Sequence, residues 1–248
     1  GGTSLRGEVA VTGAKNSVLK LMAASLLAAG TTTIRNVPDI ADVDIMADLL
    51  TRLGCTVVRS DSQVSIDVPQ TPAHRADYDL VRKMRASINV LGPLAARVGQ
   101  ADMALPGGDA IGSRGLDFQI KGLETLGAKA HIEHGYVIAE APKGLIGSKI
   151  RFPKISVGAT ENLIIAASFA KGTTVLSNCA IEPEIKDLVN FLIKMGCDLK
   201  WTAKRSIKII GVNKVNDTIY SVMFDRIEAG TYLVAAAVTE GNLKIKNV

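Results

Sequence analysis

The sequence predicts an α/β protein built from repeated αβαββ units of about 70 residues. A similar string begins at each of four marker glycines, Gly30, Gly99, Gly172 and Gly241, which are 69, 73 and 69 residues apart. Helical and strand patterns alternate between these glycines, which is typical of helices packed on sheets. Hydrophobic residues make up 47% of the 248 residues but aromatic residues only 4%, so the core is expected to be aliphatic.

Each unit opens with a helix of small and aliphatic residues, apolar enough to be buried on most sides. Helices of this kind are predicted at 17–29, 87–98, 161–171 and 229–241. We expect each to end at its marker glycine in a left-handed cap, with a strand directly after it.

A second, amphipathic helix follows the strand, for example at 42–53 in the first unit and at 186–195 in the third. A second glycine closes this helix in the complete units, at Gly54, Gly127 and Gly196. Two β-rich segments, such as 55–60 and 64–68, complete the unit.

The fourth unit contains only its first helix and first strand before the sequence ends at Val248. A unit that cannot bury its strand against its own helices is not a stable terminus. We therefore expect either that the sequence is a fragment or that another polypeptide completes this unit.

The charge balance favours anionic partners. A net charge of +5 and a pI near 9.1 suit phosphates without specifying one. One Trp, four Tyr and five Phe leave little for base stacking, and no run of five basic residues occurs, so no nucleic-acid partner is expected. No apolar stretch approaches the length of a membrane span, so no membrane association is expected either.

The cysteines and histidines predict neither disulfides nor metal. Cys55, Cys179 and Cys197 form no CxxC pair, which favours a reducing compartment and hence a cytoplasmic protein with buried, structural thiols. His131 and Glu133 would share one face of a strand while a neighbouring histidine points away, which is poor metal geometry. We expect no metal and no cofactor.

Basic residues recur where the first helices begin. Lys15, Arg85 and Arg226 lie 15, 14 and 15 residues before their marker glycines. Because a helix N-terminus favours negative charge, these cations are either ordinary solvated side chains or part of sites where an external anion supplies the missing charge.

A glycine-rich loop at 106–115 carries one carboxylate, Asp109, and one guanidinium, Arg114. Such a loop can be a lid that carries the acid over a substrate, or a hairpin connection with a surface aspartate. It matches neither a Walker A motif nor a dinucleotide fingerprint.

Six strings, in this order and at these spacings, closely resemble the bacterial UDP-N-acetylglucosamine enolpyruvyl transferases. They are GAKN at 13–16, MRAS at 84–87, LPGGDAIGSR at 105–114, SVGATEN at 156–162, EPEI at 182–185 and DRIEAGT at 225–231. The resemblance covers essentially the whole sequence. Transferases of the shikimate pathway share the fold but carry different glycine and arginine motifs.

The resemblance implies six such units in two inside-out α/β barrel domains, with the active site between them. Residues 15–223 would then form a complete first domain. Residues 1–14 and 224–248 would belong to a second domain, most of which the sequence does not contain. That missing domain would complete the active site, so the chain alone is expected to be inactive.

The implied reaction transfers the enolpyruvyl group of phosphoenolpyruvate to the 3′-hydroxyl of UDP-N-acetylglucosamine and releases phosphate, the first committed step of peptidoglycan synthesis. The resemblance assigns Lys15, Asn16 and Arg114 to phosphoenolpyruvate. It assigns to the nucleotide sugar Arg85, Arg114, Gly115, Leu116, Asp117, Phe118, Lys154, Ile155, Ser156 and Val157. A nucleotide-sugar-binding module without catalysis and a shikimate-type transferase remain the alternatives.

Asp109 stands where most members of the family carry a cysteine. A carboxylic acid can still donate a proton to the methylene carbon if its surroundings raise its pKa, or it can only order the loop. Fosfomycin, which alkylates the family's loop thiol, is expected not to inactivate this protein. Gly115 and Gln119 also depart from the proline and histidine that many members have at these positions.

Overall fold

A computed structural model describes residues 2–76, 85–105 and 115–248, and it contains the predicted unit three times. The first unit comprises α1 (Lys15–Ala24), the short 3-10 helix η1 (Ser25–Leu27), β2 (Gly30–Arg35), α2 (Ala41–Arg52), β3 (Thr56–Ser60) and β4 (Gln63–Val68). The second comprises η2 (Arg85–Val90), α4 (Leu91–Arg97), β6 (Gln100–Ala104), α5 (Asp117–Thr125), β7 (Lys129–Glu133) and β8 (Tyr136–Glu140). The third comprises α6 (Val157–Ala167), β10 (Thr173–Ser177), α7 (Pro183–Met195), β11 (Asp198–Ala203) and β12 (Ser206–Ile210).

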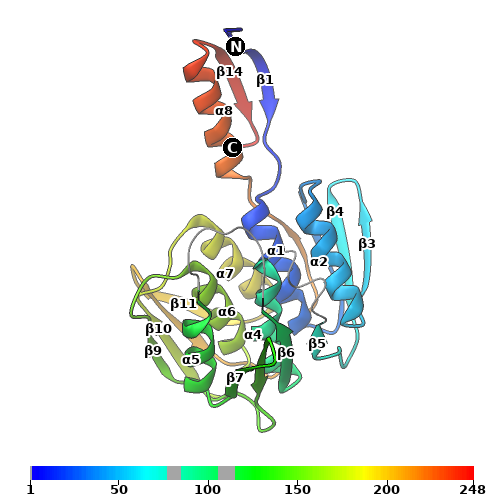
Figure 1. Ribbon diagram of the computed structural model, residues 1–248, viewed down its shortest axis with the longest axis vertical. Coiled ribbons are helices and arrows are strands. Elements are labelled where there is room, and N and C mark those ends of the chain that lie inside the picture. Colours follow the sequence, from blue (N-terminus) through cyan, green and yellow to red (C-terminus); the bar gives the residue numbers. More distant parts are fainter. Residues whose placement is uncertain (1, 77–84, 106–114) are drawn as a thin grey trace.

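We call these three units the body. The part of the fourth unit that the sequence contains projects from the body. It consists of α8 (Arg226–Val238) and β14 (Asn242–Lys246), and it is joined by β1 (Arg6–Ala10) from the start of the chain. We call these three elements the stalk (Figure 1).

Each sheet of the body has one strand more than the repeat predicts. The additional strands are β5 (Arg75–Ala76), β9 (Lys149–Arg151) and β13 (Ile219–Ser221), which pair in parallel with β6, β10 and β2. The strand orders are β13-β2-β4-β3, β5-β6-β8-β7 and β9-β10-β12-β11. Two or three residues are too few for a hydrophobic period, so sequence patterning does not detect these strands.

The first and fourth units exchange their additional strands. β5 and β9 each precede the first helix of their own unit and pair within that unit. By contrast, β1 precedes α1 but pairs with β14 in the stalk, whereas β13 precedes α8 but pairs with β2 in the body. The chain therefore passes between body and stalk twice, in segments that lie side by side (Figure 1).

Asp225 joins the two crossing segments by capping two helices. Its Oδ1 accepts hydrogen bonds from the Ile227 and Glu228 amides of α8, at 2.8 and 3.0 Å. Its Oδ2 accepts one from the Lys15 amide, at 3.1 Å, where α1 begins after an alanine that offers no capping group. One carboxylate thus satisfies backbone donors at the N-termini of both α1 and α8.

The first helices form the interior of the body and the sheets its outside. Seven of the ten residues of α1 and nine of the eleven residues of α6 are buried. α4 and α6 pack so closely that a Cβ on Gly92 would come within 2.6 Å of the Asn162 carbonyl oxygen. Strands such as β4, β10 and β12 alternate between buried residues and more exposed ones, as expected for sheets with one solvated face.

The helix ends correct one prediction. α1 ends at Ala24 and continues through η1, so the marker glycine of the first unit begins β2 and is no helix cap. α6 and α8 also end before their marker glycines, at Ala167 and Val238. The left-handed conformation predicted for the marker glycines does occur at Gly30, Gly99 and Gly172. In the fourth unit Glu240 adopts it in place of the glycine that follows. Within the described ranges, no helix is long and apolar enough to cross a membrane.

Candidate functional site

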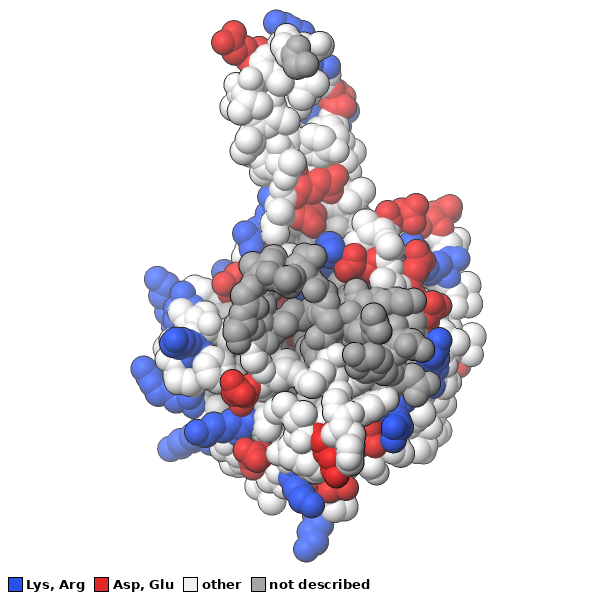
Figure 2. Space-filling model, in the orientation of Figure 1, with Lys and Arg blue, Asp and Glu red and all other residues white. Residues whose placement is uncertain are grey.

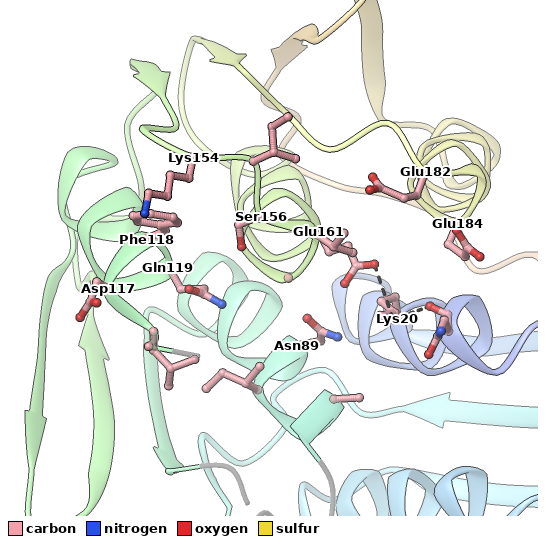
Figure 3. Close-up of a pocket in the computed structure, with 18 of the residues that line it drawn as sticks. Lys20, Asn89, Asp117, Phe118, Gln119, Lys154, Ser156, Glu161, Glu182 and Glu184 are labelled. Atoms are coloured by element: carbon pink, nitrogen blue, oxygen red, sulfur yellow. Dashed lines mark hydrogen bonds and ion pairs between the residues drawn. The ribbon is translucent and has the colours of Figure 1, made fainter. Parts of the chain in front are cut away.

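A cavity of about 850 Å³ opens where α1, α5, α6 and α7 begin. Its wall on one side comes from the residues that lead into α5 and α6, and on the other from α1, α7 and the first residue of α8 (Figure 3). Several helices thus direct their N-terminal turns towards one space. Free amides and helix dipoles at such turns favour negatively charged groups.

Most of the predicted site residues lie in this wall. The cavity brings together Asn16, Gly115, Leu116, Asp117, Phe118, Lys154, Ile155, Ser156 and Val157. Ser156 is the N-cap of α6, and its hydroxyl accepts a hydrogen bond from the Ala159 amide at 3.3 Å. This cap fixes the direction in which 154–156 enter the helix, so these residues stay at the edge of the cavity.

The structure leaves some predicted residues outside what it describes. Asp109 and Arg114 lie outside the described residues, and of Arg85 only the backbone, as the first residue of η2, lies within them. Gln119, one of the departures from the family pattern, is buried and lines the cavity.

Two of the three recurrent cations are paired with carboxylates of this chain. Lys15 stands beside the described lining of the cavity, and its Nζ lies 2.9 Å from Asp42 Oδ2 on α2. Arg226 lines the cavity and donates to both oxygens of Glu184, at 2.9 and 3.2 Å. These hydrogen bonds raise the pKa of Arg226. In this structure Lys15 and Arg226 therefore each have a carboxylate of the chain beside them, and an external anion at these positions stays a prediction.

A polar cluster that the sequence patterns did not predict lies on the cavity floor, formed by Lys20 of α1, Asn89 of η2 and Glu161 of α6 (Figure 3). Lys20 Nζ lies 3.5 Å from Glu161 Oε1 and also donates a hydrogen bond to the Asn16 carbonyl. A signal was present, because Lys20 and Glu161 are charged residues in helices predicted to be buried. No periodicity could show that they meet.

Glu161 is only 1% exposed. Burial raises the pKa of its carboxyl to about 7, and the charge of Lys20 opposes that rise. Glu161 Oε1 and Asn89 Oδ1 have no hydrogen-bond partner among the described residues, although both side chains face the cavity. The floor therefore holds two buried acceptors whose hydrogen bonding is incomplete, and one of them, Glu161 Oε1, is also in the ion pair with Lys20.

The cysteines are buried away from this chemistry. Burial raises the pKa of Cys55 and Cys197 to about 11 and that of Cys179 to about 12. His131 and Glu133 interact with each other on β7, at 3.3 Å. No cluster of metal-ligating side chains occurs among the residues that the structure describes.

Comparison with solved structures identifies the fold as that of the enolpyruvyl transferases. The enolpyruvyl transferase NikO from Streptomyces tendae matches with a TM-score of 0.81 over 95% of this chain and 56% of its own, at 21% identity. EPSP synthase from Acinetobacter baumannii matches with a TM-score of 0.79 over 100% of this chain and 57% of its own, also at 21% identity. These matches confirm the predicted fold class.

Sequence comparison gives the family. The family model for EPSP synthase (3-phosphoshikimate 1-carboxyvinyltransferase) matches residues 1–248, so the chain belongs to that family. Proteins named UDP-N-acetylglucosamine 1-carboxyvinyltransferase from Pelagibacter ubique, Corynebacterium jeikeium and Trichlorobacter lovleyi are 54%, 50% and 48% identical over 248 residues. The chain spans 60%, 59% and 59% of their lengths.

Proposed function

We propose that this cavity takes part in transferring the enolpyruvyl group of phosphoenolpyruvate to the 3′-hydroxyl of UDP-N-acetylglucosamine. The observation that carries the proposal is that three separate parts of the sequence, Asn16, 115–118 and 154–157, line one cavity at helix N-termini. Relatives about half identical to the chain carry the name of this reaction, which supports it.

We place the nucleotide sugar along the wall of the cavity that α5 and α6 form. Backbone amides at the two helix starts and the ammonium of Lys154 suit a diphosphate. The ring of Phe118 offers an apolar face to a base, and Asp117 an acceptor for a base or ribose donor. We assign Arg85 and Arg114 to the same ligand by the family resemblance.

Phosphoenolpyruvate is placed at the start of α1, with Lys15, Asn16 and Arg114. Lys15 is paired with Asp42 at 2.9 Å. Lys15 therefore has to leave the Asp42 carboxylate for the phosphate, or contact both groups at once, when phosphoenolpyruvate binds. Preorganised cations of this kind stabilise charge that develops on the phosphate-bearing intermediate.

The reaction proceeds by addition and elimination. The sugar hydroxyl loses its proton and its oxygen bonds to the central carbon of phosphoenolpyruvate, while Asp109 donates a proton to the methylene carbon. Loss of a proton from that carbon then restores the double bond and expels phosphate. No cofactor takes part in either step.

The chain's two ends are assigned to a second domain, as residues 1–14 and 224–248, and residues 15–223 to the first. The exposed apolar residues of α8 support this division. The second domain would supply the base for the sugar hydroxyl and further arginines, so we propose that this chain alone lacks turnover. A cytoplasmic role in peptidoglycan synthesis, and through it in cell shape and division, suits phosphorylated substrates and free thiols.

Hydrogen–deuterium exchange tests the assignment of the substrate. With UDP-N-acetylglucosamine we expect protection of peptides that cover 115–120 and 154–160, and no comparable protection with shikimate 3-phosphate. Protection by shikimate 3-phosphate alone would favour the shikimate-type alternative, which the description of the family model also suggests. Protection by neither ligand would contradict the proposed function.

A further inference from the structure

The floor cluster of Lys20, Asn89 and Glu161 lies between the two proposed substrate positions. In Figure 3, Asn89 and Glu161 lie between Phe118 and Lys154 on one side and Lys20 and Glu184 on the other. Lys20 also holds the Asn16 carbonyl at the start of α1. Since the reacting sugar hydroxyl has to meet phosphoenolpyruvate, the sugar ring has to occupy this middle region.

Hydrogen bonding on the floor is incomplete. Glu161 Oε1 interacts with Lys20 Nζ only as an ion pair at 3.5 Å, and Asn89 Oδ1 has no partner within the described ranges. Both side chains are at least 98% buried, with exposed fractions of 1% for Glu161 and 2% for Asn89. A buried acceptor without a partner costs free energy that a ligand's donor can recover.

The charges directly around the floor cluster disfavour a phosphate group at that position. Around the floor cluster, the cavity lining contributes Glu161, Glu182 and Glu184 together with Lys20 and Arg226, and its third described cation, Lys154, lies on the other side. Lys20 is already engaged by Glu161 and the Asn16 carbonyl, and Arg226 by Glu184. An uncharged donor, such as a hydroxyl or an amide N–H, fits these acceptors without adding negative charge.

We propose that Lys20, Asn89 and Glu161 form a subsite for the sugar ring of the nucleotide sugar, with Glu161 and Asn89 accepting hydrogen bonds from its hydroxyl or amide groups. This inference rests on the proposed function. Glu161 is the specificity-determining residue of the subsite. Lys20 is a positioning residue, because it holds both the Glu161 carboxylate and the first turn of α1.

The test compares the affinities of UDP and UDP-N-acetylglucosamine for the same variants, measured by calorimetry. The double variant Lys20→Met/Glu161→Met replaces the ion pair with apolar side chains of similar volume, a change that buried pairs often tolerate. We expect its affinity for UDP-N-acetylglucosamine to fall about tenfold, from loss of a hydrogen bond to a charged group. Its affinity for UDP should stay within about twofold, because UDP has no sugar to reach the floor.

The single variant Glu161→Gln retains a side-chain carbonyl acceptor, so most of the discrimination between UDP-N-acetylglucosamine and UDP should return. Equal affinities of wild type and double variant for the nucleotide sugar would overturn the subsite, as would an equal loss for both ligands. If the wild type binds neither ligand, the proposed function fails and the subsite fails with it. If the double variant binds UDP and still prefers UDP-N-acetylglucosamine as strongly as the wild type does, the proposed subsite is refuted and the proposed function stands.

Discussion

Burial of the Glu161 carboxyl raises its pKa from 4.5 to about 7 and makes the stability of the protein depend on pH. Between these two values the folded state binds more protons than the unfolded state, so the free energy of unfolding falls as the pH rises. At about 1.4 kcal/mol per pKa unit, the upper bound of this loss is on the order of 3 kcal/mol.

The variant Glu161→Gln should lack this dependence. Relative to the variant, the wild type is expected to lose stability between pH 5 and pH 8, in urea unfolding followed by circular dichroism. Glu124→Gln, at an exposed position of α5, is the control and should keep the wild-type profile. Parallel profiles for wild type and Glu161→Gln would contradict the raised pKa.

The buried cysteines predict a protein without a reactive native thiol. Their pKa values, raised to about 11 or 12, keep the nucleophilic thiolate scarce at neutral pH. We expect no fosfomycin adduct by intact mass under native conditions, and a slow reaction with a thiol reagent that becomes complete only in denaturant. A stoichiometric fosfomycin adduct on the folded protein would refute this prediction.

The cavity wall was predictable at the residue scale because the family resemblance assigns 115–118 and 154–157 as two continuous runs of residues, and both line the cavity. The floor was not predictable, since Lys20 and Glu161 come from units one and three and meet only through helix packing. The pairing of Arg226 with Glu184 was missed for the same reason. The sequence feature that could have indicated the floor is a charged residue in a helix that is otherwise apolar.

At the scale of elements, Gly92 sets the distance between α4 and α6. A side chain there would meet the backbone oxygen of Asn162, which cannot move away as a flexible side chain can. We expect Gly92→Val to lower the free energy of unfolding by about 1–3 kcal/mol through overpacking, measured by denaturant unfolding.

Gly230 in α8 provides the matched control for this change. A Cβ added there meets no described residue within 4 Å, so Gly230→Ala should leave stability unchanged or raise it by up to about 1 kcal/mol through helix propensity. If Gly92→Val leaves the free energy of unfolding unchanged, α4 and α6 are packed less closely than this account requires.

The repeat predicted the units because each keeps its period and its glycines, and because the first helices are apolar on nearly all sides. It could not predict the exchange of β1 and β13 between the first and fourth units. Strand pairing between the two ends of the chain leaves no local pattern, and β13 has only three residues. The local sequence pattern therefore predicts the helices and strands, whereas contacts between distant parts of the chain determine which strands pair.

At the scale of the whole molecule, the stalk exposes apolar side chains that the body buries in equivalent helices. Leu233, Val234 and Val238 of α8 are 61%, 63% and 75% exposed, and Ala229 is the one buried residue of this helix. In Figure 2 the charged side chains of the stalk lie at its tip, along one edge and near the body, and the surface between them is uncharged. A surface of this kind favours association.

We therefore expect this chain to self-associate as its concentration rises, in sedimentation or light-scattering measurements. The double variant Leu233→Glu/Val238→Glu should remain monomeric, whereas Ile146→Glu, at an exposed apolar residue of the body, should behave as wild type. A wild-type chain that stays monomeric at every concentration would refute this prediction.

The central claim is that the cavity of the body binds a nucleotide sugar, and calorimetric titration with UDP-N-acetylglucosamine tests it most directly. We predict saturable binding that is lost or weakened about tenfold or more in Lys154→Ala, because a cation beside the diphosphate is removed. Lys149→Ala, an exposed change on β9 outside the described cavity lining, should bind as wild type. Absence of binding, or binding that Lys154→Ala leaves unchanged, would contradict the account.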